Sequence, residues 1–464
     1  MSGTVGSART RSPPSAIIPS PDPLVSHRAA GQNGVMTMPS GDSPSTTDSI
    51  STRVCVAGGG PAGVMLGLLL ARAGIDVLVL EKHSDFFRDF RGDTVHPSTL
   101  NLIDQLGIRA EFDAIGHALL PRLDAVVNGV RLHAINFASL PAPNRAITLM
   151  PQWDLLKLLA IEGARSPHFE LRMGYEVVDV VRDGAGGRVT GVLAQTAGGL
   201  LRIDAELTVA ADGRDSIVRK ALDLAGREFG VPVDVTWFRL DRPSGSAPDT
   251  LGYLSDSAFI VTIPRPEYLQ CGLLVPKGSF AGLRRDGIEA FRQRIAVAAP
   301  RLATSVSSLA SIDDVKLLSV RINRLKTWSA PGALCIGDAA HAMSPVFGVG
   351  INYAVQDAVA TANLLVPVLR AGGSPKAIDA ATRAVQRRRE GPTALMQRLQ
   401  RSVHRIIGTG AGKRVLQNPP TRRQRVALRV AIPIIRPIAA RVVGYGFRPE
   451  RISREVLGEG AARR

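Results

Sequence analysis

Cysteine is scarce in this 464-residue sequence, which contains only three. Cys55, Cys271 and Cys335 lie far apart, and each is inside an apolar run where a reduced thiol packs as a small hydrophobic side chain. The sequence therefore excludes a disulfide-stapled fold and favours a reducing, cytoplasmic location.

Metal-ligating clusters and membrane-spanning runs are also absent from the sequence. No group of His, Cys and carboxylate residues has metal-ligand spacing, so we expect no metal site. The uncharged run Val54–Ala71 has the minimum length of a transmembrane helix, but Gly58, Gly59, Gly60 and Pro61 interrupt it. We interpret this run as a strand, a tight turn and a helix.

Acidic residues are few near the C-terminus. The chain has 57 Lys and Arg against 40 Asp and Glu, a net charge of +17, but residues 401–464 alone hold fifteen basic and three acidic residues. The basic character therefore belongs to a C-terminal tail and not to the whole surface, which disfavours a nucleic-acid-binding protein.

Residues 1–50 have no hydrophobic periodicity and are rich in Ser, Pro, Gly and Thr, so we expect a disordered N-terminal segment. This segment contains no apolar stretch followed by a small-residue cleavage site, so a secretory signal is not indicated, whereas its Arg and Ser content leaves a transit peptide as an alternative. Met36 and Met38 are candidate alternative start sites.

A dinucleotide-binding motif follows this segment. The pattern predicts a strand at residues 53–57, a helix at 61–72 and a second strand at 76–80. Gly58, Gly60 and Gly63 form a G-x-G-x-x-G turn between strand and helix, and Glu81 ends the second strand. Gly58 permits the turn, Gly60 lets the backbone approach a pyrophosphate, and Gly63 lets the helix pack on the strand. Glu81 has the spacing of the acid that binds a ribose hydroxyl.

A second strand–turn–helix motif lies late in the chain, at Leu334–Asn352. An NAD-binding protein needs no such element, whereas FAD has a ribityl chain and a flavin beyond its pyrophosphate. Asp338 can accept bonds from ribityl hydroxyls. Gly348 and Gly350 begin a helix whose positive end would face the flavin pyrimidine edge.

The remaining pattern predicts helices at 98–106, 152–164 and 350–369, and strands around 125–137, 170–172, 175–181, 207–211 and 333–336. From about residue 230 to 322 the chain is again interpreted as strand-like, with strands at 233–240, 258–263 and 270–275. The fold class expected is α/β: a Rossmann-like FAD-binding domain interrupted by a mostly antiparallel β-sheet substrate domain, with a C-terminal helical tail. The FAD-binding domain would comprise residues 51–121, 148–228 and 323–400, the substrate domain 122–147 and 229–322, and the tail 401–464.

At these motifs the sequence resembles the group A flavoprotein monooxygenases, the p-hydroxybenzoate hydroxylase-like family. The resemblance spans about residues 51–400. It implies that Asp212, Gly213 and Arg214, after a strand, contribute to FAD and NAD(P)H binding. It also implies that Arg91 lies near the FAD phosphates and that Gln152 opens a helix beside the cofactor. The cofactor-binding residues expected are Gly58, Gly60, Pro61, Ala62, Gly63, Glu81, Lys82, Arg91, Gln152, Asp212, Gly213, Arg214, Gly337, Asp338, Pro345, Gly348, Gly350, Ile351 and Asn352.

The resemblance implies that NAD(P)H and O2 are co-substrates and that one oxygen atom is inserted into a small aromatic or apolar organic substrate. Phe347 departs from the family pattern, which has a small residue there, and would place a ring close to the flavin. His341 is interpreted as a structural hydrogen-bonding residue, and no catalytic acid or base is assigned. Candidates to line the substrate sheet are His96, His133, Tyr253, Arg239 and Cys271.

Alternatives remain at this stage. A prenyl-type reductase and a plain oxidase share the FAD motifs. Halogenases of this fold carry a Trp-x-Trp-x-Ile-Pro stretch in the substrate domain. A halogenase is disfavoured because Phe259–Thr262, before the comparable Ile263-Pro264, contains no tryptophan. From a different class, Arg422–Arg441 alternates arginines with apolar residues and is broken by Pro433 and Pro437. This segment either binds an anionic membrane surface or packs on the body as an arginine-rich helix pair.

Overall fold

The computed structural model describes residues 49–87, 94–127, 130–242, 251–255, 258–265, 267–408 and 421–458. Most of the segment predicted to be disordered, residues 1–48, lies outside the described residues, as does Arg91. Residues 49 and 50 correct that prediction, because they already pair within the first strand.

An eight-stranded sheet carries the predicted βαβ unit. Strand β1 (Ser49–Ala57), helix α1 (Pro61–Arg72) and strand β2 (Val77–Glu81) follow one another. The main strand order is β19-β20-β11-β1-β2-β8, in which β20 (Ala333–Cys335), β11 (Gly199–Ala210), β1, β2 and β8 (Phe169–Met173) are parallel neighbours. Strands β19 (Ser329–Ala330), β10 (Val189–Thr196) and β9 (Glu176–Arg182) add antiparallel pairs.

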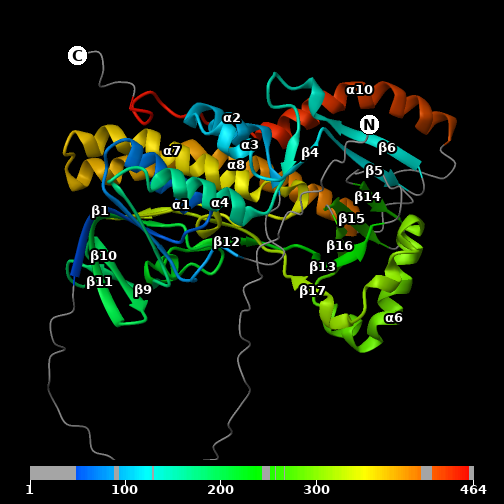
Figure 1. The fold of residues 1–464 in the computed structure, drawn as a ribbon, viewed down its shortest axis with the longest axis horizontal. Coiled ribbons are helices and arrows are strands. Elements are labelled where there is room, and N and C mark those ends of the chain that lie inside the picture. Colours follow the sequence, from blue (N-terminus) through cyan, green and yellow to red (C-terminus); the bar gives the residue numbers. More distant parts are fainter. Residues whose placement is uncertain are drawn as a thin grey trace, which may run out of the picture. The chain divides into compact units, whose positions relative to one another are not determined.

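Helices cover this sheet and form its core. In Figure 1, α1, α4 (Gln152–Gly163), α7 (Gly350–Arg370) and α8 (Pro375–Gly408) gather in one layer beside it. Helix α1 is buried along almost its whole length because Val64–Ala71 supply apolar side chains all round. The short helices are α2 (Pro97–Leu106), α3 (Arg109–Asp113) and α5 (Ile217–Ala221).

A second sheet of seven strands has the order β17-β13-β16-β15-β14-β5-β6. Its pairs are antiparallel except β14 with β5. The strands are β17 (Lys316–Leu318), β13 (Val233–Asp241), β16 (Tyr268–Pro276), β15 (Phe259–Pro264), β14 (Leu251–Leu254), β5 (Arg122–Val127) and β6 (Val130–Asn136). Two smaller sheets pair β3 (Thr94–Val95) and β4 (Ala118–Leu120) with β7 (Ile147–Leu149), and β12 (Gly226–Phe229) with β18 (Ile322–Leu325).

The strands predicted at 233–240, 258–263 and 270–275 are present as β13, β15 and β16, but the interpretation of this region as strand-like is wrong for residues 280–314. Helix α6 (Phe280–Ala298) covers one face of the seven-stranded sheet and is followed by short 3-10 turns at Pro300–Leu302, Val306–Ser308 and Ile312–Asp314. Its buried residues Leu283, Phe291 and Ile295 are spaced by multiples of four, as in a helix. Gly287 kinks the helix with a φ of 81°, and this interruption hid the period.

The tail also differs from its prediction. Helix α10 (Arg422–Tyr445) runs unbroken through Pro433 and Pro437. Both prolines are exposed, so water can satisfy the carbonyl that each ring deprives of its helical partner. The tail therefore contains one long helix here and not a broken pair.

The sheets and helices have the predicted fold class, and the described residues form one compact unit. The boundaries between an FAD-binding and a substrate domain stay a prediction. Among the described helices, none combines the length and apolarity needed to cross a bilayer.

Candidate active site

The predicted motifs meet at one edge of the eight-stranded sheet. Because β2, β1, β11 and β20 are parallel neighbours, their carboxyl ends point the same way. Glu81 ends β2, Gly58 directly follows β1, and Asp212 and Gly337 come two residues after the ends of β11 and β20. Ligands of open α/β sheets bind at such an edge.

Two glycines make the close approaches that the motif requires. Gly58 has a φ of +107°, and a Cβ there would lie 2.4 Å from the carbonyl oxygen of Ala211. A Cβ on Gly63 would lie 1.9 Å from the carbonyl oxygen of Gly58. No other residue type fits either position without moving α1 or β11 away from β1.

Open space remains at the positions where the protein backbone would approach a ligand. A Cβ on Gly60 would have its nearest neighbour at 4.0 Å, and one on Gly213 or Gly350 would meet nothing within 4 Å among the described residues. Helices α1 and α7 begin at Pro61 and Gly350 without a side-chain cap. Their first-turn N–H groups have no acceptor within the helix, and both helix dipoles present positive charge here.

The acidic residues of the site have different surroundings. Glu81 is 9% exposed, and its carboxylate accepts hydrogen bonds from the amides of Gly59 at 3.0 Å and His83 at 3.1 Å. It therefore holds the glycine turn in place. The neighbouring Lys82 is exposed and lies 3.8 Å from Glu176.

Asp212 has an unused acceptor. Its Oδ2 accepts from the amide of Ile217 at 2.8 Å, whereas Oδ1 is buried without a hydrogen-bond partner in the described part of the chain. Burial raises the pKa of Asp212, against the hydrogen bonds from Ser216 and the α5 amides that lower it. A ligand hydroxyl would satisfy Oδ1.

Asp338 is tied to the same loop. The Nε of Arg214 donates to Oδ2 of Asp338 at 3.1 Å, and about a third of each side chain is exposed. The structure therefore brings two predicted residues from distant motifs into one ion pair. Gly337, with a φ of +58°, fits between Ala62 of α1 and Ala354 of α7.

A buried network behind Gly337 was not predicted from the sequence. Asp357 on α7 is fully buried and accepts from the amide of Gly337 at 3.0 Å and from Nε of Arg389 at 2.9 Å. Nε2 of His341 lies 2.5 Å from its Oδ2. Burial raises the pKa of Asp357, but the charges and hydrogen bonds of His341 and Arg389 outweigh burial and hold it below its ordinary value. His341 is thus a buried hydrogen-bonding residue.

Helix α8 supports the loop that precedes α7. Gln400 donates to the carbonyls of Ser344 and Val346, both at 3.0 Å, and Nε2 of His404 lies 2.6 Å from Oγ of Ser344. Burial lowers the pKa of His404 to about 4, so this histidine is neutral at physiological pH. Phe347, between Pro345 and Gly348, has a φ of 68°, which is a strained conformation for an aromatic residue.

The other side of this loop is held by the segment before α2. Oγ1 of Thr94 donates to the carbonyl of Gly348 at 3.0 Å, and the buried His96 lies between that carbonyl at 3.1 Å and the carbonyl of Val443 of α10 at 2.8 Å. Burial lowers the pKa of His96 to about 4. His96 therefore links the loop to the tail helix and does not line the substrate sheet.

The start of α7 directs backbone toward the site. The side chain of Ile351 is buried in the core, so only its amide remains for a ligand. Asn352 accepts hydrogen bonds from Ser98 at 2.5 Å and Thr99 at 3.1 Å, and its Nδ2 has no partner in the segments described. Gln152 begins α4, as predicted, and is half-buried.

The two faces of the seven-stranded sheet separate the candidate substrate residues. Tyr253 and Cys271 belong to the cluster that packs under α6 and so point away from the opposite face. His133 pairs with Asp124 at 3.0 Å, and Arg239 lies over the ring of Tyr268 at 4.9 Å. Arg239, two residues from Trp237 on β13, lies on the face opposite α6, and the substrate role of these four residues stays a prediction.

The face opposite α6 carries a row that sequence reasoning missed. Trp237, Gly272, Val261 and Gly252 lie directly opposite one another on neighbouring strands. A Cβ on Gly272 would lie 3.2 Å from the indole ring of Trp237, and Nε1 of this indole is buried without a partner among the described side chains. Ile263 on the same face shares an apolar cluster with Phe347. This row therefore faces the loop before α7.

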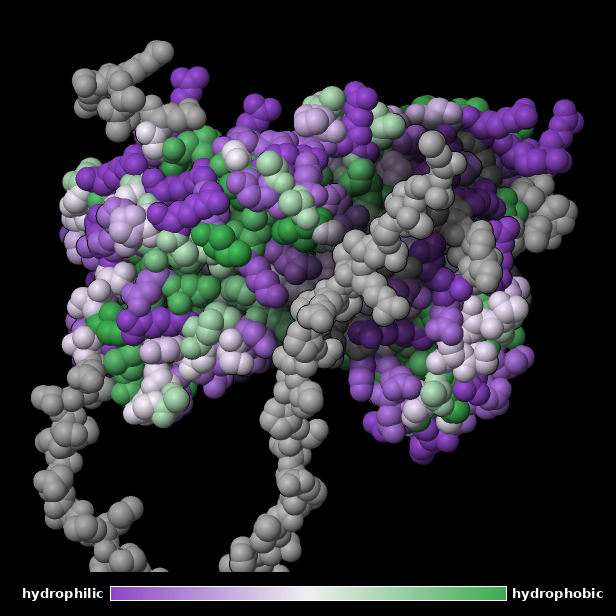
Figure 2. Space-filling model, viewed as in Figure 1, coloured by the Kyte–Doolittle hydropathy of each residue, from purple (hydrophilic) through white to green (hydrophobic). Residues whose placement is uncertain are grey.

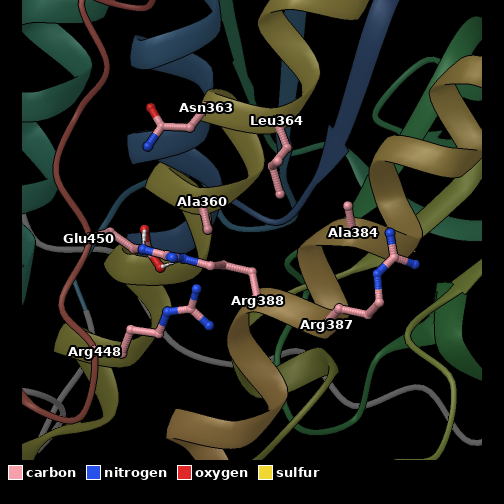
Figure 3. Close-up of a pocket in the computed structure, with 8 residues that line it drawn as sticks. All are labelled: Ala360, Asn363, Leu364, Ala384, Arg387, Arg388, Arg448 and Glu450. Carbon is pink, nitrogen blue, oxygen red and sulfur yellow. Dashed lines mark hydrogen bonds and ion pairs between the residues drawn. The ribbon is translucent and has the colours of Figure 1, made fainter.

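A separate pocket lies away from the motif. It lies between α7, α8 and the segment after α10, and Figure 3 shows Arg388 directed at Glu450, with hydrogen bonds of 2.7 and 2.9 Å. Its α7 residues begin at Ala360, more than two turns beyond Gly350. This pocket is not the predicted cofactor site.

The residues at the sheet edge fit FAD. The glycine cradle and two helix N-termini suit a pyrophosphate, and the partnerless Oδ1 of Asp212 and the Asp338 carboxylate suit hydroxyl groups. In the described part of the chain, no three His, Cys, Asp or Glu residues are placed to hold a metal ion.

Comparison with known proteins agrees with this geometry. Residues 51–398 match the family described as FAD binding domain. The chain is 31% identical to a 6-methylpretetramide 4-monooxygenase from Streptomyces rimosus over 426 residues, covering 89% of this chain and 97% of that protein. It is 25% identical to a para-nitrophenol 4-monooxygenase from a Pseudomonas strain, covering 70% of this chain and 80% of that protein.

Solved structures show the same fold. A probable FAD-dependent monooxygenase from Pseudomonas aeruginosa superimposes with a TM-score of 0.68 at 22% identity, covering 78% of this chain and 98% of that chain. An anhydrotetracycline hydroxylase from Streptomyces rimosus gives a TM-score of 0.67 at 21% identity, covering 85% of this chain and 76% of that chain.

Proposed function

Because this chain belongs to the FAD-binding-domain family, as a group A flavoprotein monooxygenase of the p-hydroxybenzoate hydroxylase-like type, we propose that it hydroxylates a phenolic compound of several fused rings. The protein is an FAD-dependent monooxygenase that uses NAD(P)H and O2. Bound FAD would supply the redox chemistry, in which two electrons from NAD(P)H reduce O2 so that one oxygen atom enters the substrate and the other leaves as water.

The observation that carries the substrate class is the near full-length match to a relative named for 6-methylpretetramide. A second relative, 26% identical over 70% of this chain, is named for 12-dehydrotetracycline and anhydrotetracycline. The sheet face opposite α6 supports this class, because the indole of Trp237 lies over Gly272 and the ring of Phe259 lies over Gly252, and these aromatic rings offer a flat ring system a surface to stack on. Trp237 offers its partnerless N–H to a phenol oxygen.

We assign the cofactor roles as follows. The amides at the start of α1 bind the pyrophosphate, Glu81 fixes the glycine turn and the adenine-side ribose, and Asp338 binds the ribityl chain. Asp212 would supply a buried acceptor for a cofactor hydroxyl, and the amides at the start of α7 would stabilise negative charge on the flavin. The Asp357 network positions Gly337 and so holds the turn after β20 against α7. The reaction requires that water be excluded from the site, and Phe347 and the apolar cluster around Ile263 contribute apolar surface that excludes it.

The test uses the full-length holoprotein, a panel of fused-ring and single-ring phenols, NADPH and ¹⁸O2. We expect one ¹⁸O atom in the product and turnover of fused-ring phenols at least tenfold above that of single-ring phenols. Products saturated at a double bond without ¹⁸O would establish the reductase alternative. The same assay with added halide tests the halogenase alternative, because a brominase from Pseudoalteromonas luteoviolacea is 22% identical over 67% of this chain.

A variant tests the substrate face. Trp237→Phe removes only the indole N–H and ring edge, and we expect KM for the phenol to rise about tenfold, the equivalent of roughly one hydrogen bond to a buried donor. Trp153→Phe is the control, because Trp153 lies on α4 beside Phe87 with ring centroids 5.0 Å apart. An unchanged KM in Trp237→Phe would remove this face from the substrate site.

We also propose a cytoplasmic location, which the three buried free cysteines support. Peripheral contact of the basic tail with a membrane is a further part of the proposal.

A further inference from the structure

Helix α10 attaches to the protein by one face of its C-terminal half. Ala440 and Val443 are buried in a cluster with Leu120 and Phe137, and Nε of Arg436 donates to the carbonyl of His133 at 2.7 Å. Ile432, Arg436, Ala440 and Val443 recur at three- and four-residue intervals, so they form one stripe. This stripe is the inner face of α10.

The outer face of α10 consists of Val426, Val430, Ile434, Ile435 and Ile438. These side chains are 55–63% exposed, and four of them recur every fourth residue. Thirteen large hydrophobic side chains are exposed among the described residues, and five lie on this helix. An amphipathic helix of a soluble protein normally turns its apolar stripe inward, whereas α10 turns this one outward.

The charge of α10 limits what can cover this face. Arg422–Tyr445 contains six arginines and no acidic residue. Figure 2 shows hydrophobic and hydrophilic residues side by side along the upper right edge, where Figure 1 places α10. A second copy docking symmetrically would bring together two arginine-rich helices with no acidic residue on either to pair with them. An anionic lipid surface offers both apolar volume for the stripe and negative charge for the arginines.

We infer that the outer face of α10 docks on an anionic lipid surface, with its valines and isoleucines among the acyl chains and its arginines at the headgroups. The inner face of the same helix belongs to the cluster that holds Ile263 and Phe347. His96 further ties Val443 to Gly348. Helix α10 therefore packs by its inner face on the side of the protein that carries the proposed substrate site. This position suits an apolar substrate drawn from the bilayer. This inference does not depend on which substrate is hydroxylated.

The test measures sedimentation of the full-length holoprotein with vesicles of phosphatidylcholine alone or with 30 mol% phosphatidylglycerol, without substrate or NADPH. We expect binding to the anionic vesicles that weakens with added salt. The triple variant Val430→Ser, Ile434→Ser, Ile438→Ser should lose at least tenfold in partitioning. A matched control, Ile161→Ser, Leu200→Ser, Val297→Ser, changes equally exposed apolar residues elsewhere and should bind as the parent does.

Folding of both variants is checked by FAD content and thermal denaturation, and Arg423→Gln, Arg425→Gln, Arg429→Gln provides a second test that leaves the stripe intact. This charge variant should also lose most binding to anionic vesicles. Equal pelleting of parent and stripe variant, or equal binding to neutral vesicles, would overturn the inference. The inference would also be overturned if the parent protein formed dimers and did not bind vesicles, while the stripe variant no longer formed dimers. Because hydroxylation is assayed separately, its failure leaves this result unaffected.

Discussion

Two alanine substitutions in the glycine motif should affect different properties of the protein: Gly63→Ala its stability and Gly60→Ala its affinity for FAD. In Gly63→Ala the new methyl would lie 1.9 Å from the carbonyl oxygen of Gly58 and 3.2 Å from Cγ1 of Val56, so α1 must move off β1. Overpacking of this kind costs about 1–3 kcal/mol, and the backbone contact puts this case at the upper end. In Gly60→Ala the nearest atom is 4.0 Å away and φ is −76°, so the protein alone should lose at most about 1 kcal/mol as an N-cap changes.

Cofactor binding should separate the two variants further. The Gly60 methyl would occupy the space through which the backbone approaches the pyrophosphate, so we expect FAD affinity to fall at least tenfold, or about 1.4 kcal/mol. Gly63→Ala should lower the thermal denaturation midpoint of the apoprotein by several degrees. Urea denaturation of the apoprotein and quenching of FAD fluorescence measure both quantities. Parental FAD affinity in Gly60→Ala, or parental stability in Gly63→Ala, would refute this account of the motif.

Two further predictions concern the loop before α7. Asp357→Asn takes from the buried Arg389 the closer of its two carboxylate partners and leaves only Glu450 at 3.4 Å, and should destabilise the protein by about 3 kcal/mol in urea denaturation. Because the folded pKa of Asp357 lies below its ordinary value, its contribution is complete above about pH 5 and is lost as pH falls through the folded pKa, so Asp357→Asn should flatten the acid limb of the stability–pH curve. Phe347→Ala removes a ring that packs against both the apolar cluster around Ile263 and a second buried cluster formed by Met343, Val349, Tyr353 and Met396. The variant should raise kcat/KM for bulky over small phenols by about tenfold, measured by NADPH-linked turnover, and an unchanged ratio would place the ring away from the substrate.

The sequence predicted those parts of the site whose signals are local. The turn Gly58–Gly63 and α1 could be placed to the residue, because glycine spacing and the flanking apolar runs act over a few positions. The strand after Gly332 and the start of α7 at Gly350 were predicted for the same reason. These elements fix the sheet edge that binds the cofactor.

The missed residues act across long separations in sequence. Asp357 and Arg389 look like ordinary polar residues on helices, and only the packing of α7 on α8 buries them together behind Gly337. Gln400 lies 56 residues from Ser344, which it holds. The Trp237 row depends on strand register, which the pattern of β13 and β16 alone does not set.

The visible absorption spectrum of the purified protein, recorded without oxygen before and after adding NADPH and a fused-ring phenol, tests the central claim most directly. We predict oxidised-flavin bands that bleach on reduction and return when O2 is admitted. A colourless protein that takes up no added FAD would contradict the assignment of the Gly58–Gly63 and Gly337–Asp338 motifs together.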